Sequence, residues 1–255
     1  MSFAVTADAY DQFMGRFSTP LAGRFVELLG LRDGDRALDV GCGPGALTRV
    51  LASRLGAAQV AAVDPAPPFV AAVRERCPGA DVRQASADAL PFADAVFDVV
   101  TAQLVVHFMR DPVAGLREMA RVTAVGGSVA ASVWDHAGGS GPLASFWDAV
   151  RELDVEAPDE SELPGTRRGD LARLATQAGL SDSTEHAITI AVPFASFDDW
   201  WQPFTLGVGP AGAYVGGLDA DARQRLRERC AERLGPGPFE VSATAWAVTA
   251  RRSPS

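Results

Sequence analysis

Residues 36–52 read RALDVGCGPGALTRVLA and run from a short apolar segment through three alternating glycines into a helical pattern. Glycine allows positive φ angles and lets a ligand approach the main chain closely. The start of the following helix presents unpaired N–H groups and a positive dipole end to an anionic group. This turn therefore predicts a nucleotide-like ligand that lies against the backbone.

Strands and helices alternate around this turn. Apolar runs predict strands at ALDV, AQVAAVD, DVRQA, FDVVTAQL and GGSVAASVW, and helical patterns begin near Ala46, Ala66 and Pro112. Such alternation is typical of βαβ units in a parallel sheet that is covered on both faces. The segments STEHAITIAVPF and FEVSATAWAVTARR predict two further strands in succession, hence an antiparallel edge. We expect an α/β fold with a doubly wound, mostly parallel sheet.

The length of 255 residues suits one domain, 1–255, and an apolar content of 47% can fill its core. Within it we expect an N-terminal helical segment at 1–34, a cofactor-binding core at 35–134 and a helical lid insertion at 195–238. The pattern becomes loose between 136 and 163.

Composition and charge argue against several classes of partner. No stretch reaches the ~20 apolar residues of a membrane span, and the N-terminus lacks a signal-peptide pattern, so we expect a cytoplasmic protein with no membrane partner. A net charge of −9 without a clustered basic face argues against nucleic acid. The three cysteines lack CxxC spacing, so neither a disulfide framework nor a metal site is predicted.

Two carboxylates bear on the kind of ligand. Asp64 ends the second predicted strand, where an acidic side chain can accept both ribose hydroxyls of a nucleotide-like cofactor. The glycines also satisfy the dinucleotide pattern G-x-G-x-x-A, which leaves an NAD enzyme open. Asp39, just ahead of the glycines, would repel a pyrophosphate and attract an ammonium or sulfonium group.

Four motifs in order, LDVGCGPG, VDPAPPFV, ADALPFADAVFDVV and the GG before SVAASVW, resemble the class I S-adenosylmethionine-dependent methyltransferases of the small-molecule branch. The resemblance covers Leu38 to Trp134 closely and the final strand pair more loosely. It implies a seven-stranded Rossmann-like sheet with an antiparallel last strand, and S-adenosyl-L-methionine as the cofactor.

The resemblance also implies the roles of individual residues. Asp39 would face the ammonium of the cofactor, Asp64 would hold its ribose hydroxyls, and Asp88 would accept from its adenine amine. The implied cofactor-binding residues are Asp39, Gly41, Cys42, Gly43, Asp64, Pro65, Asp88, Ala89 and Gln103.

Methyl transfer depends first on alignment, and a general base is needed only for some acceptors. His107, after the fourth strand, is the best-placed candidate for a catalytic base, and His136 is a second. His186 lies inside a strand pattern and is expected to be structural. The wall of a substrate pocket is expected from two apolar segments, in the side chains of Tyr10, Phe13, Met14, Phe17, Trp200, Trp201 and Phe204.

The resemblance implies methyl transfer, and these side chains predict a small apolar or aromatic acceptor. Two other functions use the same features. An NAD-dependent oxidoreductase would need the same glycines and Asp64, and a non-catalytic methyltransferase-like protein would bind the cofactor as a sensor or subunit. The acceptor, the methylated atom and the oligomeric state are not defined by the sequence.

Overall fold

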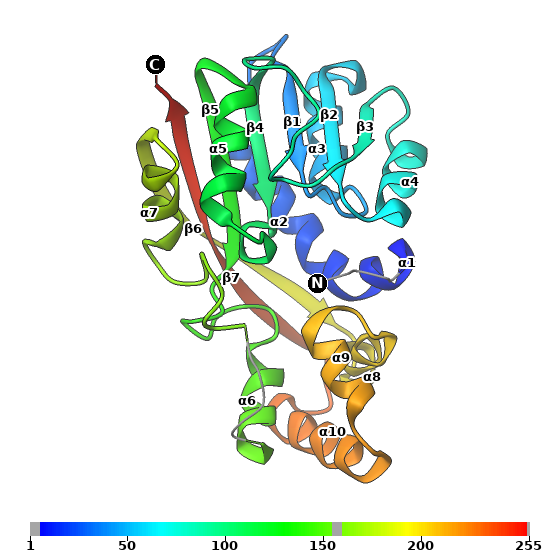
Figure 1. Cartoon of the computed structure of the whole chain (residues 1–255). Coiled ribbons are helices and arrows are strands. Elements are labelled where there is room, and N and C mark those ends of the chain that lie inside the picture. Colours follow the sequence, from blue (N-terminus) through cyan, green and yellow to red (C-terminus); the bar gives the residue numbers. More distant parts are fainter. Residues whose placement is uncertain (1–5, 155–159, 254–255) are drawn as a thin grey trace.

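The computed structural model describes residues 6–154 and 160–253, and the strands of this part form one seven-stranded sheet (Figure 1). The strand order is β3-β2-β1-β4-β5-β7-β6. The strands β1 to β5 pair in parallel, and β7 is antiparallel to both of its neighbours, β5 and β6. The bounds are Ala37–Val40 for β1, Val60–Asp64 for β2, Asp81–Gln84 for β3, Phe97–Gln103 for β4, Thr123–Trp134 for β5, Leu180–Phe194 for β6 and Phe239–Arg252 for β7.

The predicted doubly wound sheet with an antiparallel last strand is confirmed. The strands β1 and β2 are buried along their whole lengths, because helices cover both faces of the sheet. The long helices are α2 (Arg16–Glu27), α3 (Ala46–Leu55), α4 (Pro67–Arg76), α5 (Pro112–Val122), α6 (Ala144–Leu153), α7 (Asp170–Gln177), α9 (Gly209–Gly217) and α10 (Ala220–Leu234). The short ones are α1 (Ala7–Tyr10), η1 (Asp11–Gly15), η2 (Ala57–Gln59), η3 (Val106–Phe108), α8 (Phe197–Trp201) and η4 (Gln202–Leu206).

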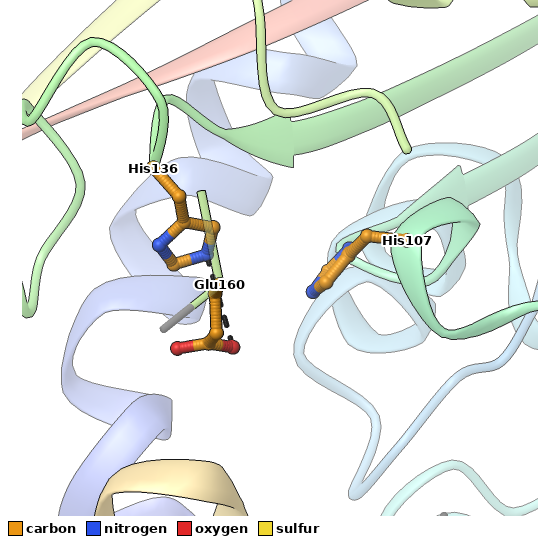
Figure 2. Close-up of side chains that lie close together, drawn as sticks. All are labelled: His107, His136 and Glu160. Carbon is orange, nitrogen blue, oxygen red and sulfur yellow. Dashed lines mark ion pairs between the residues drawn. The ribbon is translucent and has the colours of Figure 1, made fainter. Parts of the chain in front are cut away.

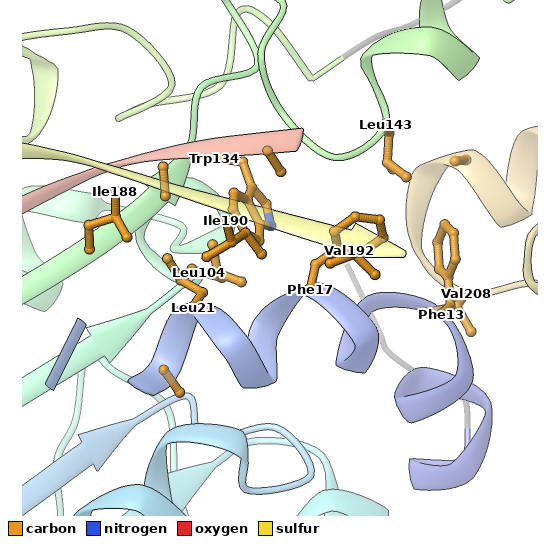
Figure 3. Packing of buried hydrophobic residues seen from close by; sticks show 14 of the residues in the cluster. Phe13, Phe17, Leu21, Leu104, Trp134, Leu143, Ile188, Ile190, Val192 and Val208 are labelled. Atoms are coloured by element: carbon orange, nitrogen blue, oxygen red, sulfur yellow. The ribbon is translucent and has the colours of Figure 1, made fainter. Parts of the chain in front are cut away.

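The edge strand β6 buries only one of its two faces. Ile188, Ile190 and Val192 pack into the core that Phe17 and Leu21 of α2 also enter (Figure 3). The side chains between them, at 187, 189 and 191, are exposed. This alternation is the strand pattern that the sequence shows, and it fixes α2 against the sheet.

The expectation of a loose segment between 136 and 163 is wrong for α6. This helix buries Phe146, Trp147 and Val150, and it contacts α10. It begins after Leu143, which offers no side-chain cap, so the usual start signal is missing from the sequence. The burial of its apolar face against the rest of the core stabilises it instead.

The helices α8, α9 and α10 lie between β6 and β7, inside the range expected for the insertion. Asp219 caps α10, since its carboxylate accepts a hydrogen bond from the Ala222 N–H. Together with α6, these helices lie beyond the edge at which the parallel strands end (Figure 1). Every helix in the described ranges is too short or too polar to cross a bilayer.

Five aromatic residues expected in the substrate wall are buried in the main hydrophobic core: Phe13, Phe17, Trp200, Trp201 and Phe204. Phe204 is 1% exposed, and its ring centroid lies 4.6 Å from that of Phe146 and 4.7 Å from that of Trp200. These residues join the insertion to α6 and to the N-terminal helices.

We expect Phe204→Ala to lower the free energy of unfolding by ~3–5 kcal/mol, because it removes a buried ring and leaves a cavity. Chemical denaturation followed by fluorescence measures the change. The control is Leu153→Ala, which truncates a side chain that is 49% exposed and should change the free energy by less than about 0.5 kcal/mol. Equal losses in the two variants would contradict the placement of Phe204 in the core.

Candidate functional site

The main cavity lies where β1, β2, β4 and β5 end, the edge at which open α/β sheets bind ligands. Its walls come from the N-terminal helices, the glycine turn, the loops after β2, β3, β4 and β5, and the start of α9. Among its lining residues are Tyr10, Phe13, Met14, Asp39, Gly41, Cys42, Gly43, Asp64, Pro65, Phe69, Ser86, Gln103, His107, Trp134, His136, Glu160, Val208 and Pro210.

The glycine turn needs glycine for two different reasons. Gly41 and Gly43 have φ angles of +70° and +51°. A Cβ atom on Gly41 would lie 2.5 Å from a methyl group of Val105, so a neighbouring side chain fills that space. A Cβ on Gly43 would meet no described atom within 4 Å, and Gly43 lines the cavity. The backbone at Gly43 is therefore open to a ligand.

Asp64 joins this turn to the end of β2. Its Oδ2 accepts a hydrogen bond from the Gly43 N–H at 2.9 Å, and its Oδ1 accepts one from the Ala66 N–H at 2.8 Å. Asp64 is 6% exposed, and burial raises its pKa above the ordinary value. The residue both caps the following loop and faces the cavity.

Asp39 is buried more completely than Asp64. It is 1% exposed, and its Oδ2 accepts a hydrogen bond from the Thr48 hydroxyl at 2.7 Å. Burial, and then the nearby Asp64 charge, raise the pKa of Asp39 from 3.8 to about 7, against the opposing effect of the Thr48 hydrogen bond. A cation in the cavity would stabilise the ionised form of this carboxyl group.

Several buried polar atoms along the cavity have no hydrogen-bond partner among the described residues. Gln103 donates from Nε2 to the Ser18 carbonyl oxygen at 3.0 Å, which leaves its Oε1 without a donor. The Ser18 hydroxyl and the Trp134 indole N–H also have no hydrogen-bond partner among the described residues. Because buried polar atoms are normally satisfied, these atoms indicate a wall built to bond a polar ligand.

His107, His136 and Glu160 form the other polar part of the wall (Figure 2). The His136 Nε2 lies 4.0 Å from a Glu160 carboxylate oxygen, and the other oxygen accepts a 3.4 Å hydrogen bond from the Trp147 indole. The ring centroids of His107 and His136 are 6.0 Å apart. Burial, and secondly the neighbouring His136, lower the pKa of His107 well below its usual value, so its ring is neutral.

The structure brings most of the expected cofactor-binding residues to one cavity. Asp88 and Ala89 are the exceptions, because both are exposed and neither lines the cavity. Ala85, Ser86 and Ala87 form that part of the wall instead. The side chain of Ser86 bonds that of Asp88 and lowers the pKa of its carboxyl group. The assigned roles of Asp88 and Ala89 therefore remain predictions.

The expected substrate residues divide into two groups. Tyr10, Phe13 and Met14 line the main cavity. Phe17, Trp200 and Phe204 line a smaller neighbouring cavity, and Trp201 is buried in the core. His186 lies on β6, as expected for a structural histidine.

Sequence reasoning missed other parts of the wall. Trp134 ends β5, and its place at the carboxyl end of a parallel strand was a usable signal. The segment 208–211 follows a glycine turn in the insertion, but its side chains are small and gave no signal. Glu160 lies in a segment without periodicity, so only the tertiary structure places it beside the two histidines.

Comparison with known proteins agrees with this geometry. Residues 38–131 match the family model described as a methyltransferase domain. The malonyl-[acyl-carrier protein] O-methyltransferase of Halorhodospira halophila is 38% identical over 133 residues, which cover 50% of this chain and 45% of that protein. An uncharacterized methyltransferase of Schizosaccharomyces pombe is 31% identical over 138 residues, 50% of each chain. The chain spans about half the length of these curated relatives.

A solved structure shares the fold over nearly the whole chain. A putative methyltransferase from Bacillus halodurans C-125 superposes with a TM-score of 0.60 at 17% identity and covers 91% of this chain and 99% of that one. At this identity the likeness concerns the fold alone. The order of the sheet, with β7 antiparallel next to β5, also differs from the 3-2-1-4-5-6 order of the dinucleotide-binding fold.

Proposed function

We propose that the chain transfers a methyl group from S-adenosylmethionine to a small acceptor bound in the main cavity, because residues 38–131 match the methyltransferase domain model and form that cavity's glycine turn. One observation carries the proposal: two buried carboxylates, and an amide oxygen with no donor among the described residues, face the same cavity as the open backbone of the glycine turn. The domain match favours this function over NAD-dependent hydride transfer.

The residues of this wall fit the polar groups of S-adenosylmethionine. The carboxylate of Asp39 and the Oε1 of Gln103 can accept from its ammonium group, and Gln103 Oε1 has no other donor among the described residues. Asp64 already accepts two backbone hydrogen bonds, but a carboxylate has about four acceptor positions, so it can also accept from the ribose hydroxyls. Gly43 lets the ligand lie against the main chain.

Bound S-adenosylmethionine supplies a methyl group activated by the positive charge on its sulfur. The chain contributes alignment and the exclusion of water, which can provide much of the rate of such a substitution. Phe13 and Met14 of the N-terminal segment and Val208 and Pro210 of the insertion add apolar side chains to the wall of the cavity. Tyr10 also lines the cavity and packs against Phe69 after β2. We therefore propose an apolar or aromatic acceptor, and we propose that the insertion at 195–238 acts as a lid through residues 208–211.

The reacting atom of the acceptor is proposed to lie against His107. Its neutral ring retains a nitrogen lone pair that can interact with the acceptor. His136 and Glu160 lie beside it and give this end of the cavity its polar character. A protein that binds the cofactor without catalysis would need none of these three side chains in the wall.

Gly43→Asn tests the cofactor's place against the backbone. Asparagine tolerates a φ of +51°, so the fold should hold, while its side chain would enter the space that the ligand needs. We expect the affinity for S-adenosylhomocysteine, measured by calorimetry, to fall by at least about tenfold, which is 1.4 kcal/mol.

The matched control is Gly30→Asn. Gly30 has a φ of +60° and is exposed, and a Cβ atom on it would likewise meet no described atom within 4 Å. Its substitution should cause similar backbone strain and leave the affinity unchanged. If both variants bind S-adenosylhomocysteine as the wild type does, the ligand does not lie on the glycine turn.

Asp39 should make cofactor binding depend on pH. Only the ionised carboxyl group attracts an ammonium, and the pKa of Asp39 in the unbound protein is about 7. Affinity for S-adenosylhomocysteine should therefore rise about tenfold between about pH 6 and about pH 8, because the ionised fraction rises by that factor. Calorimetry at several pH values measures it.

Asp39→Asn keeps an oxygen for the Thr48 hydroxyl and removes the charge, so the variant should bind weakly with a flatter pH profile. The free energy of unfolding should depend on pH in the opposite sense to the affinity, because ionisation of Asp39 favours ligand binding but disfavours the unbound folded state. The raised pKa means that the unbound wild type loses stability as the pH rises from about 4 through 7, and the variant should lose less. Identical affinity profiles for the two proteins would refute the role of Asp39.

A further inference from the structure

Three side chains that can bind metal ions converge at the acceptor end of the cavity. His107 belongs to η3 after β4, His136 to the loop after β5, and Glu160 to the segment that follows α6. One ligand atom from each residue lies within 4.8 Å of the other two. Figure 2 shows His107 facing the other two side chains from the opposite side of the space between them.

The surroundings favour the binding of a cation. His107 and Glu160 are each 5% exposed, so the carboxylate is removed from most of the solvent. The Trp147 indole N–H donates a hydrogen bond of 3.4 Å to the Glu160 carboxylate, which helps to orient it. A buried carboxylate beside two imidazole rings is stabilised by a positive charge between them.

We propose that His107, His136 and Glu160 bind one divalent transition-metal ion of the zinc type. Two imidazole nitrogens and one carboxylate oxygen are a ligand set that suits zinc, cobalt and iron, whereas magnesium and calcium prefer oxygen ligands alone. Three protein ligands also leave coordination positions open, which is typical of catalytic rather than structural sites.

The site needs only a small contraction to bind the ion. Bonds of about 2.1 Å place the ligand atoms of a tetrahedral ion roughly 3.4 Å apart, so separations of up to 4.8 Å must shorten by at most about 1.4 Å. The Nδ1 of His107 has no hydrogen-bond partner in the described part of the chain. No hydrogen bond to that nitrogen therefore fixes the ring against the necessary rotation.

The ion would also take part in the proposed methyl transfer, and this role of the ion rests on that proposed function. An acceptor hydroxyl that coordinates the ion becomes more acidic: its O–H bond breaks, the electron pair stays on oxygen and the proton passes to solvent. The oxygen then forms a bond to the methyl carbon, while the electron pair of the carbon–sulfur bond stays on sulfur. The acceptor class is thus a small apolar molecule with a hydroxyl group, and His107 is a metal ligand rather than the base.

Metal binding is tested without any acceptor. Protein freed of metal by a chelator is titrated with Co²⁺, whose visible absorption reports nitrogen and oxygen coordination, and with Zn²⁺ in a calorimeter. We expect one ion per chain for the wild type. Glu160→Gln and His136→Asn should each weaken binding by at least about tenfold and lose most of the visible band.

His186→Asn is the matched control, since His186 is the third of the three histidines and lies on β6 outside the cavity lining. It should bind Co²⁺ as the wild type does. Thermal unfolding of the metal-free proteins establishes that each variant is folded. Absence of Co²⁺ binding in the wild type, or equal binding in Glu160→Gln and wild type, would overturn the metal site.

Two further measurements separate this proposal from the proposed function. S-adenosylhomocysteine binding is measured in the presence of chelator, where Glu160→Gln should match the wild type. Loss of that binding in every protein would refute the cofactor assignment and leave the metal site standing. Methyl transfer to a panel of phenols and alcohols should stop on chelation and return with Zn²⁺, and transfer that persists without metal would refute the role of the ion in the reaction.

Discussion

The pair of hydrogen bonds that Asp64 accepts from Gly43 and Ala66 holds the site together. The carbonyl oxygen of Val63 adds two more, from the N–H groups of Gly41 and Cys42. These bonds tie the turn after β1 to the end of β2, so the open backbone and the carboxylate face the same cavity. The other walls of the cavity include the loops that follow the remaining parallel strands.

The central part of the fold could be predicted because its signals are local. Parallel strands buried on both faces, such as β1 and β2, are continuous apolar runs, and Asp219 marks the start of α10 by its capping side chain. The helix α6 has no capping side chain and is stabilised by tertiary contacts, so its sequence gave too weak a signal.

The site could be predicted only where it follows the strand ends. Asp39 and Gln103 lie near the ends of predicted strands and Gly43 just after one, and the sheet brings them together. The aromatic residues of the insertion could not be assigned, because a large apolar side chain has the same pattern in a core and in a pocket wall: Phe204 is core, while the small segment 208–211 lines the cavity. Glu160 could not be predicted, because it follows no predicted strand and only the tertiary structure places it beside the histidines.

Two buried carboxyl groups, those of Asp39 and Glu160, line the same cavity. Removing a carboxylate from water costs free energy, and a positive charge placed beside it offsets that cost. In the proposed function a ligand with an ammonium group would do so at Asp39, and the proposed divalent ion would do so at Glu160. Burial makes the ionised form of both carboxyl groups unfavourable, and a cationic ligand would lower that free-energy cost. A neutral or anionic molecule would not, so the burial of these groups would make the cavity selective for cationic ligands.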